Sequence, residues 1–215
     1  MSERFWGRPS PPVVRRFLRL FLALSLWFAV VYVGADALTA RRSDLVRVDF
    51  AWESATPFVP EMTWIYSSIY LVFLAAPFVL RTERELGALA AALAAVVAAG
   101  GAGFLLAPAR LAYPASPALA DGLTAKLLRA ADRLNLDYNL VPSLHVALSA
   151  TTLGAMATRA GRYGRVLLAL CAAAIGLSTI LTHQHHLLDV AAGYAVALAA
   201  LIAVYRPRSA SATPS

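Results

Sequence analysis

Charged residues are scarce in this sequence: Asp, Glu, Lys and Arg make up 14% of its 215 residues, against about 25% in an average soluble domain. Hydrophobic residues reach 60%, and the mean hydropathy is +0.64. This balance excludes an ordinary soluble domain and indicates an integral membrane protein. Several apolar stretches approach the roughly 20 residues that cross a bilayer, so one polytopic domain accounts for nearly all of the chain.

Cysteine and acidic residues are also few. The single cysteine, Cys171, excludes an internal disulfide, and its place within an apolar run indicates a small packing residue. The chain has 12 Asp and Glu against 19 Lys and Arg, which gives a pI of about 10.1. We interpret this excess of basic residues as contact with anionic lipid at the cytoplasmic face, and we expect no nucleic-acid partner.

The apolar runs predict an all-α fold, with six transmembrane helices in one bundle that forms a single membrane domain over residues 20–205. A basic terminus (1–19) precedes this bundle and a polar tail (206–215) follows it. Ala35-Asp36-Ala37 resembles a signal-peptidase site, so a cleaved leader is the alternative to a retained first helix. The predicted spans cover about 20–38, 62–80, 86–107, 141–158, 164–182 and 187–205.

Two further features concern the connections and the packing. Gly100, Gly101 and Gly103 in the third span predict close helix packing, because small residues let helix backbones approach each other in lipid. The connection 109–139 contains a short amphipathic pattern, with Leu123, Leu127, Ala130 and Leu134 on one stripe and Lys126, Arg129 and Arg133 on another. That pattern predicts a helix lying at the membrane interface.

Basic residues also predict the orientation of the bundle. Six spans place both termini on one side, and most Lys and Arg residues lie in the short segments on that side. The positive-inside rule therefore places both termini in the cytoplasm and the two longer loops outside, as expected for a protein of the bacterial inner membrane.

The histidines gather at the outer end of this predicted bundle. His145 lies one turn into the fourth span, and His183, His185 and His186 lie where the fifth span returns to the same side. His185 and Asp189 are four residues apart, so on a helix the carboxylate can accept a hydrogen bond from the imidazole. Such a pair fixes the tautomer and leaves the other ring nitrogen free to attack, accept a proton or bind a metal.

The start of the fourth span predicts an anion site next to His145. Pro142 is suited to the first turn of a helix, because its missing N–H would be unpaired there. The free amides and the positive dipole end of that turn favour a phosphate, to which Ser143 can donate a hydrogen bond.

The sequences P-S-L-H at 142–145 and S-T-x5-H-x3-D at 178–189 resemble the second and third motifs of the type-2 phosphatidic acid phosphatase superfamily. The segment P-F-V-P-E-M-T-W-I-Y at 57–66 and the H-x-H-x3-D pattern are similar to the branch of inositol phosphorylceramide and sphingomyelin synthases. The resemblance implies a six-helix core, a phosphohistidine on His185, orientation by Asp189 and protonation of the leaving oxygen by His145. It implies a lipid phosphate or phospholipid substrate and no cofactor.

The sequence departs from the superfamily pattern at three places. Leu144 and Thr179 replace the usual glycine and arginine, and the basic first motif is matched only loosely by Lys126 to Arg133. Phosphoryl transfer spreads negative charge over equatorial oxygens, so another cation must replace the lost arginine. The candidate phosphate-binding residues are Ser143, His183, Lys126, Arg129 and Arg133, and Arg110 is a further outward-side cation.

Four functions remain open at this level. We favour a membrane lipid phosphotransferase or phosphatase, which transfers a phosphoryl group to another molecule as well as to water. A plain lipid phosphatase is the first alternative. A metal-dependent hydrolase would use His145, His183, His185 and Asp189 as ligands, but its sequence lacks a short H-x3-H pair. A lipid transporter with a histidine relay is the fourth, although transport sites usually lie near the midplane. The headgroup and the oligomeric state are not determined by the sequence.

Overall fold

The computed structural model describes residues 5–113, 121–136 and 138–210, which form an all-α fold. The first four residues of the predicted basic terminus and the last five of the predicted tail lie outside this range. The helices are α1 (Pro11–Thr39), α2 (Thr63–Ser67), α3 (Ile69–Val79), α4 (Glu83–Leu106), α5 (Leu123–Leu134), α6 (Leu144–Ala157), α7 (Arg162–Leu181), α8 (Leu187–Ala200) and α9 (Arg206–Ser209). Short helical turns η1 (Ala51–Ala55) and η2 (Pro60–Met62) precede α2, and a π-helical turn η3 (Leu201–Tyr205) joins α8 to α9.

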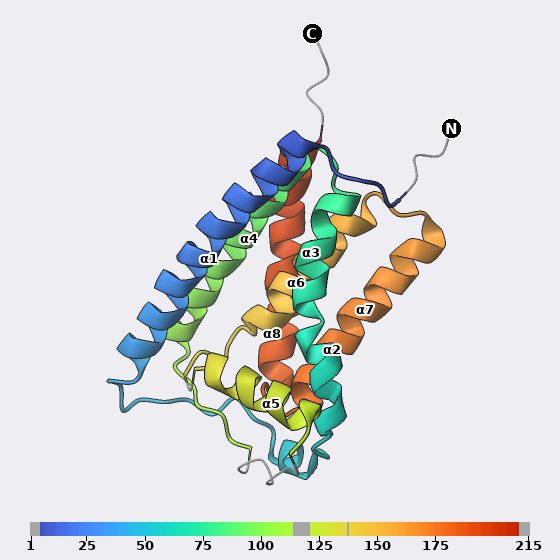
Figure 1. The fold of residues 1–215 in the computed structure, drawn as a ribbon. Helices are drawn as coiled ribbons and strands as arrows, with labels where there is room; N and C mark the ends of the chain where they lie inside the picture. Colours follow the sequence, from blue (N-terminus) through green and yellow to red (C-terminus); the bar gives the residue numbers. More distant parts are fainter. Residues whose placement is uncertain (1–4, 114–120, 137, 211–215) are drawn as a thin grey trace.

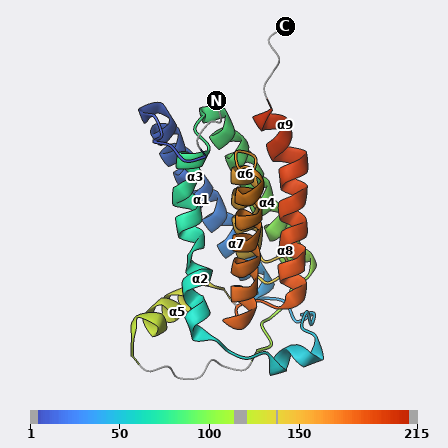
Figure 2. The same cartoon turned by 90° about the vertical axis from the view of Figure 1, so that its right-hand side faces the viewer.

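The long helices run alternately between two ends of the molecule (Figure 1). The starts of α1 and α4 lie at the same end as α9, whereas α5 and the loops before α2 lie at the opposite end (Figures 1 and 2). The six alternating segments are α1, α2–α3, α4, α6, α7 and α8–α9. The candidate site residues at the start of α6 and in the α7–α8 turn therefore lie at the end that carries α5.

Five of these six segments are long and apolar enough to cross a membrane: Pro11–Thr39, Pro60–Val79, Glu83–Leu106, Arg162–Leu181 and Leu187–Ser209. The remaining helix, α6, has 14 residues, which correspond to about 21 Å at 1.5 Å per residue. A hydrocarbon core is about 30 Å thick, so the predicted fourth span, 141–158, is not confirmed by length. α6 starts later than the predicted 141 because Ser143 takes the N-cap position, where its side chain accepts a hydrogen bond from Val146 N–H.

The boundaries of α1 also differ from the predicted first span. α1 begins at Pro11, before the predicted start at residue 20, because Ser10 is extended and a proline fits the first helical turn. Its large side chains face two ways. Leu22, Leu26 and Val30 are exposed, as expected for a lipid-facing surface, whereas Phe28 and Tyr32 pack against the central core.

The core lies around α4, which packs against α1 on one side and α6 on another. Alanines dominate α4, and Ala88, Ala92 and Val96 are buried at its centre. Two of the predicted packing glycines meet the start of α6 directly. A Cβ on Gly100 would lie 2.5 Å from Leu144 Cδ2, and one on Gly103 would lie 2.7 Å from the Val141 carbonyl oxygen. The glycines thus let α4 approach the segment that carries the Pro-Ser-Leu-His motif.

The predicted amphipathic helix is confirmed as α5, but its packed face differs from the predicted stripe. Ala125, Leu128 and Ala131 are buried, whereas Leu123 and Leu134 are exposed. Leu123, Ala130 and Leu134 of the predicted stripe therefore face outward, where they can contact lipid, whereas the buried residues between the two stripes face the protein. Trp64 on α2 donates a hydrogen bond from Nε1 to Thr124 Oγ1 at 3.1 Å and joins α5 to the bundle.

Candidate active site

His185 and Asp189 form the buried pair that their spacing predicts. His185 lies in the turn between α7 and α8, Asp189 lies in the first turn of α8, and His185 Nδ1 is 2.7 Å from Asp189 Oδ2. Asp189 is 0% exposed, so its carboxylate needs this donor in place of water. Because the carboxylate accepts, Nδ1 carries the proton and Nε2 keeps its lone pair. An imidazole held in this way is prepared for nucleophilic attack through Nε2.

The turn that presents His185 is held by the end of α7. The carbonyl oxygen of Thr179 accepts hydrogen bonds from the backbone N–H groups of Gln184 and His185, at 2.9 and 3.1 Å. His183, inside this turn, has φ of 57°, which lies in the left-handed region that non-glycine residues rarely adopt. The turn is therefore tightly constrained, and the Thr179 hydroxyl points back to its own helix, where it donates to the Gly176 carbonyl.

His145 occupies the first turn of α6 and contacts Tyr66 of α2 in two ways. Its Nε2 lies 2.8 Å from the Tyr66 carbonyl oxygen, and the two rings stack with their centroids 3.9 Å apart. A carbonyl only accepts, so Nε2 carries a proton and Nδ1 is the nitrogen available for proton transfer in this conformation.

The two motifs are joined through their backbones. Ser143 N–H donates to the Asp189 carbonyl oxygen at 2.9 Å, which ties the start of α6 to the first turn of α8. The Ser143 side chain is buried and accepts from Val146 N–H at 3.3 Å. Its hydroxyl oxygen is thus used as a helix cap.

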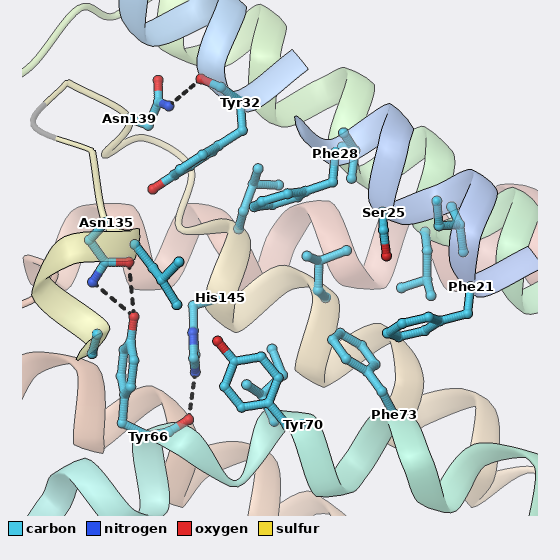
Figure 3. Close-up of a pocket in the computed structure, with 18 of the residues that line it drawn as sticks. Phe21, Ser25, Phe28, Tyr32, Tyr66, Tyr70, Phe73, Asn135, Asn139 and His145 are labelled. Carbon is cyan, nitrogen blue, oxygen red and sulfur yellow. Dashed lines mark hydrogen bonds between the residues drawn. The ribbon is translucent and has the colours of Figure 1, made fainter. Parts of the chain in front are cut away.

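An apolar cavity of about 330 Å³ opens beside the histidines. His145 and His185 both line this cavity, and Figure 3 shows His145 among the surrounding side chains. The two candidate catalytic histidines therefore face one shared cavity. The other walls come mainly from aromatic and aliphatic side chains of α1, α3, α4 and α6, among them Phe21, Leu24, Phe28, Tyr70, Phe73, Leu93, Leu144 and Leu148. The cavity has a size typical of a small-molecule site and lies between helices that could cross a membrane.

A network of hydrogen-bonded polar side chains connects the segments next to the histidines. The Tyr66 hydroxyl accepts from Asn135 Nδ2 at 2.9 Å, Asn135 also donates to the Gln184 side chain, and Gln184 donates to Asp132 at 2.8 Å. These bonds link α2, α5 and the His183–His186 turn. Gln184 and Asn135 were not predicted as site residues, since single amide side chains in a polar connection carry no distinctive pattern.

Two of the four histidines are directed away from the cavity. His183 Nε2 lies 3.0 Å from the Thr56 carbonyl, and its ring stacks on Tyr113 at 4.1 Å. His186 Nδ1 lies 3.1 Å from Glu53 Oε2. The structure thus brings His145, His185 and Asp189 together and leaves His183, a predicted phosphate ligand, facing the loop before α2. Glu53 was not predicted either, because an isolated acid in a loop gives no signal in the sequence.

The predicted cations lie outside the described lining of the cavity. Lys126, Arg129 and Arg133 are exposed on α5, and Arg129 pairs with Asp121 at 3.2 Å. Arg110 is exposed as well. Their role at the phosphate therefore stays a prediction.

The geometry gives the metal-site alternative no support. Within residues 5–113, 121–136 and 138–210, no group of three or more His, Cys, Asp or Glu side chains is arranged to hold a metal ion. Of the four predicted ligands, His183 lies apart from His145, His185 and Asp189, because its Nε2 contacts the Thr56 carbonyl oxygen.

Comparison with known proteins places the chain in a family. The model of the PAP2 superfamily matches residues 50–203, most of the chain, including both histidine motifs. No curated protein and no solved structure gave a significant match. The match does not extend to the narrower resemblance to inositol phosphorylceramide and sphingomyelin synthases. The chain belongs to the PAP2 superfamily, whose members typically are enzymes that act on phosphate esters.

Proposed function

We propose that this protein is a membrane-embedded lipid phosphotransferase or phosphatase that works through a phosphohistidine on His185. The observation that carries the proposal is the 2.7 Å contact between His185 Nδ1 and buried Asp189, on a cavity that His145 also lines. Membership of the PAP2 superfamily supports activity on lipid phosphates in general.

In the first step, His185 Nε2 attacks the phosphorus atom of the lipid. A P–N bond forms, the P–O bond to the leaving alcohol breaks, and His145, which must enter this step protonated on both ring nitrogens, transfers its Nδ1 proton to the leaving oxygen. Asp189 stabilises the positive charge that develops on the His185 ring. The lipid alcohol is then free beside an apolar cavity that suits its hydrocarbon portion.

In the second step, water or an acceptor alcohol attacks the phosphohistidine. The P–N bond breaks, a new P–O bond forms, and His145 accepts the proton of the attacking hydroxyl. Both histidines return to their starting states, so the cycle needs no redox partner. The chemistry divides one difficult displacement into two easier ones.

The first turn of α6 is the best-placed anion site for the phosphate. Amides at a helix start lie at the positive end of the helix dipole. Here Ser143 N–H donates to Asp189 and Val146 N–H donates to Ser143 Oγ, so the amides of Leu144 and His145 are the candidate donors. Ser143 and His145 occupy this turn. We assign the remaining positive charge to Lys126, Arg129, Arg133 or Arg110, which lie at the same end of the molecule but outside the described cavity lining.

Two departures from the superfamily motifs favour transfer of the phosphoryl group to an alcohol over simple hydrolysis. Leu144, in place of glycine, lines the cavity and packs against Gly100, which narrows the approach of water to His185. Thr179, in place of arginine, is buried and bonded to its own helix, so it provides no positive charge for a monoester dianion. Both features suit a phosphodiester donor, as in the synthases that the third motif resembles.

We further propose that α6 is a sixth membrane-embedded segment and that the active site faces the outer side of a bacterial inner membrane. α6 is apolar and packs between α4, α7 and α8, so protein surrounds it and a short helix suffices. The excess of basic residues near the termini supports cytoplasmic ends.

The nucleophile is tested by trapping the intermediate. Purified protein mixed with lipid labelled at phosphorus and quenched rapidly should carry an acid-labile phosphoryl group. His185→Ala should lose this label and at least about a thousandfold in kcat, because the attacking nitrogen is gone. His186→Ala should still form it, since its ring faces Glu53. Labelling of His185→Ala equal to that of His186→Ala contradicts the assignment. A parallel reaction with a chelator should keep its activity, and loss of activity there would indicate a metal-dependent route.

The acceptor is tested by offering two donors. A phosphodiester lipid should yield product only when an alcohol such as diacylglycerol or ceramide is present, because the narrowed site disfavours water. Phosphatidic acid serves as the monoester control. Rapid release of inorganic phosphate from phosphatidic acid, unaffected by any alcohol, would leave a plain lipid phosphatase.

The topology is tested with single cysteines in a Cys171→Ala background. Ala55→Cys, next to the site, should react in intact cells with a membrane-impermeant thiol reagent. Ala210→Cys, at the opposite end, should react only after the cells are opened. Both positions are exposed, so the reverse pattern would place the site in the cytoplasm, and equal labelling would contradict two distinct sides.

A further inference from the structure

The buried carboxylate of Glu53 is the strongest polar feature that the proposed reaction does not use. Glu53 lies in η1, ahead of the second span, and is 1% exposed. Its Oε1 accepts from Phe50 N–H at 2.9 Å. Its Oε2 accepts from the backbone N–H of Leu187 at 3.0 Å and faces His186 Nδ1 at 3.1 Å. A loop carboxylate therefore reaches the turn that carries His185.

The surroundings keep this carboxylate charged and in place. Burial alone raises the pKa of Glu53, but the N–H groups of Phe50 and Leu187 and the His186 ring outweigh burial and lower it below its usual value. Tyr113 packs over His186 with ring centroids 4.4 Å apart, and its hydroxyl lies 3.4 Å from Glu53 Oε2. His186 Nε2 accepts from the backbone N–H of Ala112 at 3.2 Å. Both ring nitrogens of His186 thus have hydrogen-bond partners.

Glu53 also supplies the capping hydrogen bond that the N-cap residue of α8 does not make. His186 occupies the N-cap position of α8, and its side chain makes no capping hydrogen bond there. The Leu187 amide, the first of the helix, is instead bonded by Glu53 from a distance of 134 residues in the sequence. A negative charge at this point also stabilises the positive end of the helix dipole. The first turn of the same helix carries Asp189.

We propose that Glu53 is a positioning residue for catalysis, which fixes the spacing of His185 and Asp189 by capping α8 and holding His186. His185 directly precedes His186 in the chain, and Asp189 lies two residues after Leu187. One carboxylate therefore holds the segment between the two members of the catalytic pair. Glu53 is absent from the described lining of the cavity, so it acts through these neighbours and does not contact the substrate. The inference rests on the proposed roles of His185 and Asp189.

Hydrogen exchange tests the cap without any substrate. In Glu53→Ala, amides of the segment 183–190 should exchange about fivefold faster, the factor expected for a lost helix cap, while peptides of α4 keep their rates. Glu61→Ala is the matched control, because Glu61 is an exposed acid of the same loop. Glu53→Gln retains an acceptor oxygen for Leu187 N–H and should recover part of the protection.

Kinetics then tests the consequence for the reaction. Glu53→Ala should lower kcat by at least about tenfold, as is typical when a partner that orients a functional side chain is removed, while KM changes by less than about threefold. Glu53→Gln should lie between wild type and Glu53→Ala, and Glu61→Ala should match wild type. Combining Glu53→Ala with His186→Ala should cost little more than Glu53→Ala alone, because both variants disrupt one network.

The outcomes separate this inference from the proposed function. Exchange and kcat of Glu53→Ala equal to those of Glu61→Ala would overturn the positioning role. Faster exchange in every helix, or an additive double variant, would reduce Glu53 to a general contribution to stability and would also overturn it. If His185→Ala kept wild-type kcat, the proposed function would fail, and the exchange data would still decide whether Glu53 caps α8.

Discussion

The hydrogen bond between His185 and Asp189 is the interaction on which the rest of this end of the molecule depends. A fully buried carboxylate is costly unless it is paired, and here the partner is the imidazole four residues earlier at 2.7 Å. The pair can form only if α8 begins just after His186 and the preceding turn is tight. The Thr179 carbonyl, the left-handed His183 and the Glu53 cap are the means by which the chain meets these conditions.

Distant segments then bring the remaining groups to this pair. Ser143 N–H donates to the Asp189 carbonyl, so the start of α6 is tied to the start of α8. This contact sets where His145, two residues after Ser143, lies relative to Asp189. Glycines of α4 permit α6 to approach, and α2 holds His145 through Tyr66. The aromatic and aliphatic side chains of α1 and α3 complete the cavity that His145 and His185 line, and Figure 3 shows His145 facing the aromatic side chains of these two helices.

Local patterns in the sequence were sufficient for much of this arrangement. The four-residue spacing predicted the His185 and Asp189 bond, the apolar runs predicted the long helices, and the amphipathic pattern of 123–134 predicted α5. The predicted fourth span was not confirmed, since the Ser143 cap delays the start of α6 and leaves it with 14 residues. Glu53 and Asn135 could not be predicted, because their partners lie 134 and 69 residues away and nothing in the local pattern marks them. The departures at Leu144 and Thr179 were visible in the sequence, but their packing was not.

The central claim, a covalent phosphohistidine on His185, has a stereochemical consequence. Each in-line displacement at phosphorus inverts its configuration, so two successive displacements restore it. The most direct measurement is to supply a lipid substrate that is chiral at phosphorus through oxygen isotopes or sulfur, and to determine the configuration of the product. The account predicts overall retention, and overall inversion would show direct attack by the acceptor and contradict it.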